Sequence, residues 1–391
     1  MAKRGHDLAL DGVRGLAIAA VMLTHGAGVF VPSPANDWLL KWFRYGWMGV
    51  DLFFVLSGFL ITGILLDTAE AGNRARSFYA RRILRIFPIY YLTLFGCMLL
   101  ISISRSARAG APLQGWKDYL AYLLYFQNWL PLWHGGNLPG SYLGHFWSLG
   151  VEEQFYFVWP CVVWWLRCPS KVVRIAVGGA TGMLILRIIL MRLFGPGVWY
   201  LCLTVTRGDG LLLGAALAGW TKQKKRISPL AVASAFSVGM GFLVWMSLTN
   251  DRQLSDITAG RWLGTFGFSA IALLFAAAVA STRIGLLRPI WEAKPLTILG
   301  KYSYGLYVYH LPLWFFVSVV FWRWMRIGPP FRTRYAVPYL AFLILADIAV
   351  AWLSYRFIES RFLRLKRYFE PSVSDNVLQP YPTGTEVTPV R

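Results

Sequence analysis

The feature that most constrains this chain is a series of apolar runs that recurs along almost all of its 391 residues. Hydrophobic residues make up 57% of the sequence and charged residues only 15%, well below the ~25% of an ordinary soluble domain. A helix of ~20 apolar residues crosses the ~30 Å hydrocarbon core of a bilayer. We therefore expect an all-α polytopic membrane protein with about ten transmembrane helices. The helices are predicted near residues 8–30, 46–66, 83–104, 146–166, 172–193, 207–220, 229–248, 263–281, 302–322 and 336–358.

A further apolar segment, residues 118–131, is too short to cross a bilayer as a helix. Counting it as a crossing would also place the basic residues 222–226 and one terminus on opposite sides of the membrane. We therefore predict that this segment is re-entrant or interfacial.

The formal net charge of +21 would suggest nucleic-acid binding in a soluble protein. Here the basic residues gather in short segments between apolar runs, which is the pattern of cytoplasmic loops. The strongest groups are Lys3 with Arg4 and the segments 74–85, 222–226 and 361–367. All fall on one side if both termini are cytoplasmic, so we expect this topology, contact with the lipid bilayer and no nucleic-acid partner.

Residues 1–367 are expected to form one transmembrane domain. Residues 368–391 contain Pro380, Pro382 and Pro389 and little apolar content, so we expect a disordered cytoplasmic tail. The four cysteines lie in or next to apolar runs and form no CxxC pair, so we predict neither a disulfide nor a metal site.

Ionisable residues inside the first predicted helix point to function, because such residues are costly in a membrane unless they pair or line a cavity. Arg14 and His25 are eleven residues apart, which places them on one helix face about 16 Å apart along the axis. Asp11 lies close to the same line. The alternative is an Asp11–Arg14 ion pair at the helix end and a structural histidine.

Two further motifs follow in the second and third predicted helices. Ser57 and Gly58 would let another backbone or a ligand approach closely, although plain helix packing explains them as well. Arg81 and Arg85 lie one turn apart at the cytoplasmic mouth of the third helix. Arginines there could bind phosphates through paired hydrogen bonds, and the alternative is an ordinary basic loop.

Two adjacent carboxylates, Glu152 and Glu153, lie within the fourth apolar run. His145, Ser148 and Glu152 share one helix face, whereas Glu153 faces about 100° away. The two glutamates therefore need different partners, and we favour a functional role for them.

Polar residues also open two later helices. Arg207 and Asp209 could form an ion pair or contact a polar ligand. Tyr304 and His310 lie in a tyrosine-rich stretch that could be an interfacial belt with a structural histidine, or part of a binding site.

Together these motifs resemble the acyltransferase-3 family of bacterial membrane acyltransferases, which O-acylate surface carbohydrates. The resemblance extends from about residue 8 to residue 360, and its specificity comes from six motifs in order. They are residues 10–15 with His25, residues 50–59, 78–90, 146–156, 207–209 and 303–310.

The resemblance implies a location in the bacterial inner (plasma) membrane and an acyl-CoA donor, usually acetyl-CoA, that arrives from the cytoplasm. It implies an acceptor hydroxyl on an extracytoplasmic carbohydrate or glycolipid, in polysaccharide biosynthesis of the cell envelope, and no metal. His25 corresponds to the family's conserved histidine and Arg14 to its conserved basic residue. Phe78, Arg81 and Arg82 correspond to its arginine-rich motif.

We therefore hypothesise that Arg14, Arg81, Arg82 and Arg85 hold the coenzyme A phosphates, with Phe78 beside them. His25 acts as general base on the acceptor hydroxyl or is itself transiently acylated. Glu153 or Glu152 orients the imidazole or the acceptor. The predicted substrate-binding residues are Asp11, Ser57, Trp147, Ser148, Arg207, Asp209, Tyr304 and His310.

Two other classes of protein share some of these features. A polytopic transporter or flippase for a polar or glycolipid substrate would use the same charges as a path, but such proteins often contain inverted repeats and this sequence has none that we detect. A structural membrane scaffold would gain nothing from buried carboxylates and histidines.

Overall fold

A computed structural model gives the fold of the chain. It describes residues 7–30, 37–103, 113, 115–135, 142–197, 199–255, 260–325 and 329–372. Within these ranges every regular element is a helix and no strand is present. The all-α prediction is therefore confirmed. The predicted basic residues Lys3 and Arg4 and most of the predicted tail, residues 373–391, lie outside the described residues.

Each predicted span coincides with a helix of the structure. The long helices are α1 (Leu8–Gly26), α3 (Gly49–Asp67), α4 (Arg74–Ile103), α8 (Trp147–Leu166), α9 (Pro169–Phe194), α12 (Asp209–Lys222), α13 (Pro229–Ser255), α14 (Phe268–Arg283), α16 (Lys294–Met325) and α17 (Pro329–Ser354). The shorter ones are α2 (Asp37–Arg44), α6 (Trp116–Leu123), α7 (Leu130–Trp133), α10 (Trp199–Cys202), α11 (Thr204–Arg207), α15 (Arg288–Trp291) and α18 (Ser360–Leu365). Two π-helical turns, Leu263–Gly267 and Tyr355–Glu359, adjoin α14 and α17.

Eight helices in the described part of the chain are long and apolar enough to cross a membrane. They make this a multi-span membrane protein. The helices α8 and α12 are not among the eight, and α12 has only 14 residues, or ~21 Å at 1.5 Å per residue. The count of about ten spans therefore stays a prediction.

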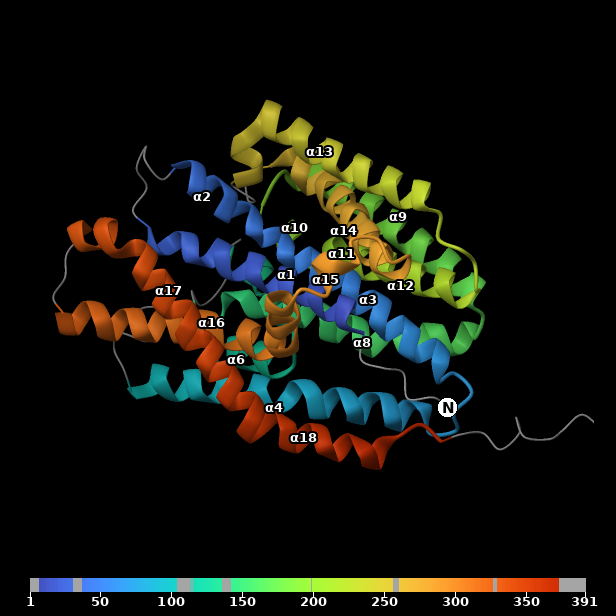
Figure 1. Cartoon of the computed structure of the whole chain (residues 1–391), viewed down its shortest axis with the longest axis horizontal. Helices are drawn as coiled ribbons and strands as arrows, with labels where there is room; N and C mark the ends of the chain where they lie inside the picture. The colour runs from blue at the N-terminus through green and yellow to red at the C-terminus, as the bar shows by residue number, and fades with distance from the viewer. Residues whose placement is uncertain are drawn as a thin grey trace, which may run out of the picture.

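The helices α1 and α3 lie in the middle of the bundle, with α13 along one edge and α4 with α18 along the opposite edge (Figure 1). Glycines allow the central backbones to approach closely. A Cβ on Gly300 of α16 would lie 1.9 Å from the Asp11 carbonyl oxygen of α1, and a Cβ on Gly58 of α3 would lie 1.8 Å from the Leu211 carbonyl oxygen of α12. Only glycine permits such contacts, so the close approach predicted at Gly58 is made by a neighbouring helix backbone.

Residues 116–133 form the short helices α6 and α7 with a 3-10 turn between them, so they do not make one continuous spanning helix. Side chains of the long helices satisfy the irregular backbone. Tyr90 Oη donates a hydrogen bond to the Tyr122 carbonyl (2.7 Å), and Gln154 Nε2 donates one to the Tyr125 carbonyl (2.8 Å). Non-helical backbone is tolerated at membrane depth only where the protein supplies such partners, as in the predicted re-entrant or interfacial segment.

The chain beyond α18 returns to the start of α4. Ser77 Oγ donates a hydrogen bond to the Phe369 carbonyl (2.8 Å), and Asn73 Nδ2 donates one to the Glu370 carbonyl (2.9 Å). The Ser372 amide donates in turn to Asn73 Oδ1 (2.8 Å). Residues up to Ser372 therefore pack against one end of the bundle.

Candidate active site

A cavity of about 510 Å³ opens between α1, α3, α4, α8 and α16. Its lining combines apolar side chains with an unusual number of ionisable ones. The polar lining residues are Arg14, Ser57, Asp67, Thr68, Ser77, Arg81, Arg82, Arg85, Ser148, Glu152, Glu153, Tyr156, Ser303, Tyr304, Tyr307 and Lys366.

The lining contains five basic side chains, Arg14, Arg81, Arg82, Arg85 and Lys366. The first comes from the start of α1, the next three from the first turns of α4, and the last from the segment after α18. Converging cations repel one another unless an anion compensates them, so this part of the cavity is suited to a ligand with several negative charges.

Neighbouring side chains position two of these arginines. Asp11 Oδ1 accepts a hydrogen bond from Arg14 Nη1 (2.6 Å), and the carboxylate is buried whereas the Arg14 side chain is 25% exposed. The Arg82 guanidinium lies over the ring of Tyr156 at 4.9 Å and over that of Phe78 at 6.0 Å. Neighbouring side chains therefore hold both arginines in place at the cavity lining.

Glu152 and Glu153, on α8, line the same cavity. Ser57 Oγ on α3 donates a hydrogen bond of 2.7 Å to Glu152 Oε1. The cavity therefore contains a basic group and a carboxylate pair together.

Two histidines form a direct pair beside the cavity. His25 Nδ1 and His310 Nε2 are 3.0 Å apart, and the ring of His145 lies 4.8 Å from that of His310. His310 is fully buried and His25 is half-buried. His25 is not one of the described residues that line the cavity, and the side chain that contacts its imidazole is His310. The proposed pairing of His25 with Glu152 or Glu153 stays a prediction.

Tyr307 separates the cavity from the histidines. Its hydroxyl is 2.5 Å from Ser148 Oγ and donates to the His145 carbonyl oxygen (2.9 Å), while its ring lies 5.7 Å from that of His310. Tyr304, one turn earlier, lines the cavity and donates to the Ile86 carbonyl (2.7 Å). Tyr307 therefore lines the cavity and also contacts the ring of His310.

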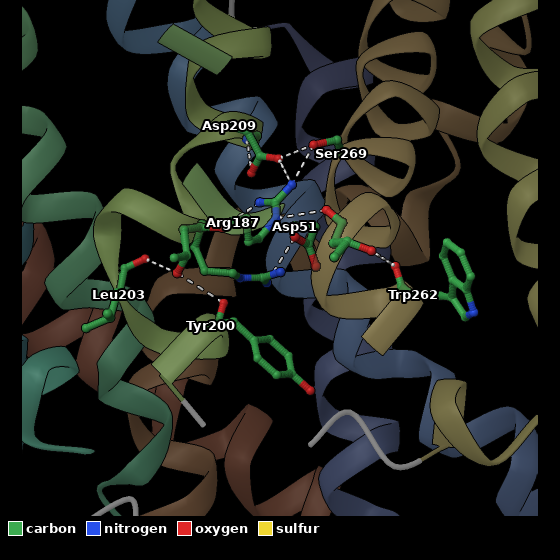
Figure 2. Close-up of polar contacts among 11 residues, drawn as sticks. Asp51, Arg187, Tyr200, Leu203, Asp209, Trp262 and Ser269 are labelled. Atoms are coloured by element: carbon green, nitrogen blue, oxygen red, sulfur yellow. Dashed lines mark hydrogen bonds and ion pairs between the residues drawn. The ribbon is translucent and has the colours of Figure 1, made fainter. Parts of the chain in front are cut away.

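Arg207 and Asp209 lie outside the described lining. Asp209 belongs to a buried ion-pair network with Arg187 and Ser269 (Figure 2). Arg187 Nη2 on α9 donates to Asp209 Oδ2 (2.9 Å), and Arg207 Nη2 is 3.0 Å from Asp51 Oδ1 on α3. The network joins α3, α9, α12 and α14, because Ser269 Oγ on α14 also donates to Asp209 Oδ2 (2.7 Å).

Trp147 belongs with this network, since the Arg207 guanidinium lies 5.6 Å from its ring. The positions of Trp147, Arg207 and Asp209 favour the ion-pair interpretation that the sequence left open. Their predicted role in substrate binding stays a prediction.

The structure thus brings most of the predicted residues to one cavity, places Asp11 against the lining residue Arg14, and divides the others between the histidine pair and the ion-pair network. Sequence reasoning missed Lys366, Tyr307 and Arg187. A signal existed for each of them, since Lys366 lies within the basic segment 361–367, Tyr307 lies within the 303–310 motif and Arg187 is a charge inside an apolar run. Among the described residues no group of three or more His, Cys, Asp or Glu side chains is placed to hold a metal ion.

Fold and site define a polytopic membrane protein whose cavity is suited to a polyanionic ligand and adjoins a histidine pair. A family model described as "Acyltransferase domain" matches residues 7–356. The chain therefore belongs to this acyltransferase family, and the resemblance inferred from its motifs is confirmed.

Two curated relatives illustrate the similarity. The peptidoglycan O-acetyltransferase OatA of Listeria monocytogenes is 30% identical over 376 residues, which cover 90% of this chain and 55% of the relative. The O-acetyltransferase OatA of Staphylococcus aureus is 30% identical over 368 residues, which cover 90% of this chain and 56% of the relative. The chain thus spans about half the length of these relatives. No solved structure matches it.

Proposed function

We propose that this protein is an O-acetyltransferase that takes an acetyl group from cytoplasmic acetyl-CoA and transfers it across the membrane to a hydroxyl of an extracytoplasmic carbohydrate. The observation that carries the proposal is the cavity with five converging cationic side chains next to a histidine pair. Family membership supports acyl transfer, and the names of the OatA relatives support a carbohydrate of the peptidoglycan type as acceptor.

The donor class follows from the charges. Coenzyme A carries three phosphate groups at one end and its thioester at the other. The arginines of α4 and Arg14 offer planar donors that match phosphate oxygens, and the volume of about 510 Å³ is within the ~300–1,000 Å³ of ordinary ligand sites. The basic segments define the cytoplasmic side under the proposed topology, so the donor enters from the cytoplasm.

His25 is the proposed base. It lies at the last turn of α1, on the opposite end of that helix from Arg14, and it is half-buried rather than enclosed. The acyl chain must pass Tyr307 to reach it. An acceptor hydroxyl that approaches His25 from the outer side could then lose its proton to the imidazole.

The carboxylates of Glu152 and Glu153 lie on the donor side of Tyr307. We propose that they fix the donor cavity, Glu152 through its hydrogen bond from Ser57 and Glu153 through its proximity to the basic group. Carboxylates beside the arginines also reduce the mutual repulsion of the cations while the site is empty.

The donor assignment is tested by comparing acetyl-CoA with S-acetylpantetheine, which has the thioester but lacks the nucleotide phosphates. We expect Arg81→Ala to raise the KM for acetyl-CoA at least tenfold and to leave the KM for S-acetylpantetheine unchanged, since a charge-assisted hydrogen bond contributes ~1.5–3 kcal/mol. Arg174→Ala, an exposed arginine of α9 outside the cavity lining, is the matched control and should change neither KM.

Equal effects of Arg81→Ala on both donors would contradict phosphate binding at this cavity. The transporter alternative is separated by a substrate-uptake assay in vesicles without any acyl donor. Uptake that needs no donor would favour the transporter.

A further inference from the structure

We propose that His310 is a positioning residue that fixes the ring tautomer of His25, so that Nε2 of His25 carries the free lone pair used in acyl transfer. The proposal rests on the proposed function for its catalytic consequence. Its structural part, the tautomer, can be measured independently of any activity.

His310 has a buried ring nitrogen, Nδ1, whose partners are backbone carbonyl oxygens. Its Nδ1 lies 2.7 Å from the Tyr307 carbonyl oxygen and 3.1 Å from the Leu306 carbonyl oxygen. A carbonyl oxygen only accepts hydrogen bonds, so His310 Nδ1 must carry a hydrogen atom. Backbone geometry of α16 therefore assigns the proton of this ring.

The assignment then passes to His25. A neutral imidazole carries one N–H, so with Nδ1 protonated the Nε2 of His310 holds a lone pair and accepts a hydrogen bond. The atom 3.0 Å away is His25 Nδ1, which must be the donor. The neutral His25 ring then has no proton on Nε2.

Burial keeps His310 neutral. The residue is fully buried, with His145 against it at 4.8 Å and Tyr307 at 5.7 Å between ring centroids. Among the described residues, the titratable side chains whose rings contact it are His25, His145 and Tyr307, and none of these three brings a negative charge. A charged imidazolium in this surrounding would be costly, whereas a neutral ring is not.

His310 would act on His25 as the carboxylate of a hydrolase triad acts on its histidine, whose tautomer the carboxylate fixes. A neutral imidazole does this without a permanent charge buried in a membrane protein. When His25 Nε2 takes a proton, its Nδ1–H bond to His310 becomes charge-assisted and strengthens.

In the transfer step, the acceptor O–H proton moves to His25 Nε2, the acceptor oxygen forms a bond to the acyl carbon, and the C–S bond of the thioester breaks. The electron pair of that bond leaves with the sulfur, which takes the proton from His25 and departs as the thiol. If the acyl group instead rests on His25, the nucleophile is the same Nε2 lone pair, so both routes need the same tautomer.

The test compares two substitutions at one position. In His310→Gln the amide oxygen can still accept a hydrogen bond from His25 Nδ1, whereas His310→Phe fills the space without an acceptor. We expect His310→Phe to lower kcat by about 10²-fold or more with the KM for acetyl-CoA unchanged, and His310→Gln to recover most of the loss. His134→Gln, which removes a histidine paired with Asp118, is the matched control.

A second readout is the ring tautomer itself, measured on protein with ¹⁵N-labelled histidine by nitrogen chemical shifts, with His25→Ala to assign the signal. Wild type should show His25 protonated on Nδ1 and bare on Nε2 at neutral to mildly basic pH, and His310→Phe should show protonated Nε2. If His310→Phe does not fold, the same measurement on wild type and His310→Gln decides.

A wild-type His25 that carries its proton on Nε2, or a His310→Phe enzyme with normal kcat, would overturn the proposal. Failure of acetyl transfer in wild type would overturn the proposed function and leave the tautomer result intact.

Discussion

Replacing Arg187 by methionine is expected to destabilise the helix bundle strongly and to leave donor binding unchanged. The Arg187 side chain is fully buried and donates to Asp209 Oδ2 (2.9 Å), Ser269 Oγ (2.6 Å), the Thr206 carbonyl (2.5 Å) and the Thr265 carbonyl (3.0 Å). Without it the Asp209 carboxylate stays buried and loses its ion-pair partner. Breaking a buried pair in this way costs ~3–5 kcal/mol.

The assay is thermal unfolding of the purified protein in detergent, followed by the fraction that remains monodisperse. We expect the midpoint of Arg187→Met to fall by several degrees. The double variant Arg187→Met with Asp209→Leu should recover most of the loss, because it removes the unpaired charge as well. The matched control is Arg288→Met, which breaks the ion pair of Arg288 with Glu292. Because the Arg288 side chain is 70% exposed, we expect this substitution to lower the free energy of unfolding by only ~0–1 kcal/mol.

An Arg187→Met protein with the unfolding midpoint of wild type would contradict a stabilising role of the ion pair that joins α9, α12 and α14. If its KM for the acceptor were also raised, Asp209 would instead be a ligand-binding group, as the sequence allowed.

Three further predictions concern the packing, the topology and the donor cavity. Hydrogen bonds from the Ser170 side chain and from the backbone amides of Ser170 and Lys171 lower the pKa of the Cys168 thiol to about 7. A membrane-impermeant maleimide should therefore label Cys168 increasingly fast as the pH rises from 6 to 8. Under the proposed topology the labelling occurs in inside-out vesicles only, and Cys168→Ser removes it. Labelling of intact cells would reverse the topology. Gly58→Ala forces a methyl group into the backbone of α12 and should lower the unfolding midpoint, and an unchanged midpoint would contradict the close contact. Asn73→Ala releases residues 370–372 from the mouth of the cavity and should raise the KM for acetyl-CoA with kcat unchanged; an unchanged KM would show that this segment does not shape the donor site.

The helices were predictable from the sequence because the apolar runs report them directly. Residues 118–131 were also placed correctly outside the set of spanning helices, since the segment is too short for a helix that crosses the bilayer and its crossing would separate the basic segments. The sequence could not show how Gly15 and Gly300 bring α1 and α16 into backbone contact, because glycines that pack helices look like glycines anywhere.

The candidate site was predictable in its residue types and less so in its pairings. The shared face of Arg14 and His25 followed from helix periodicity, and Arg14 does line the cavity. Periodicity within one helix cannot report which side chain of another helix lies opposite. For that reason the sequence predicted neither the contact of His25 with His310 nor the position of Lys366, more than 280 residues from Arg85, at the cavity.

The most direct test of acetyl transfer across the membrane uses radiolabelled acetyl-CoA and inside-out vesicles. The cytoplasmic face of the protein meets the added acetyl-CoA, and the carbohydrate acceptor is enclosed in the vesicle. We predict that wild type moves label to the enclosed acceptor, and that His25→Ala binds acetyl-CoA with unchanged affinity and moves none. Transfer by His25→Ala at the wild-type rate would contradict the central role of His25, and label that reaches only acceptors on the added-donor side would contradict transfer across the membrane.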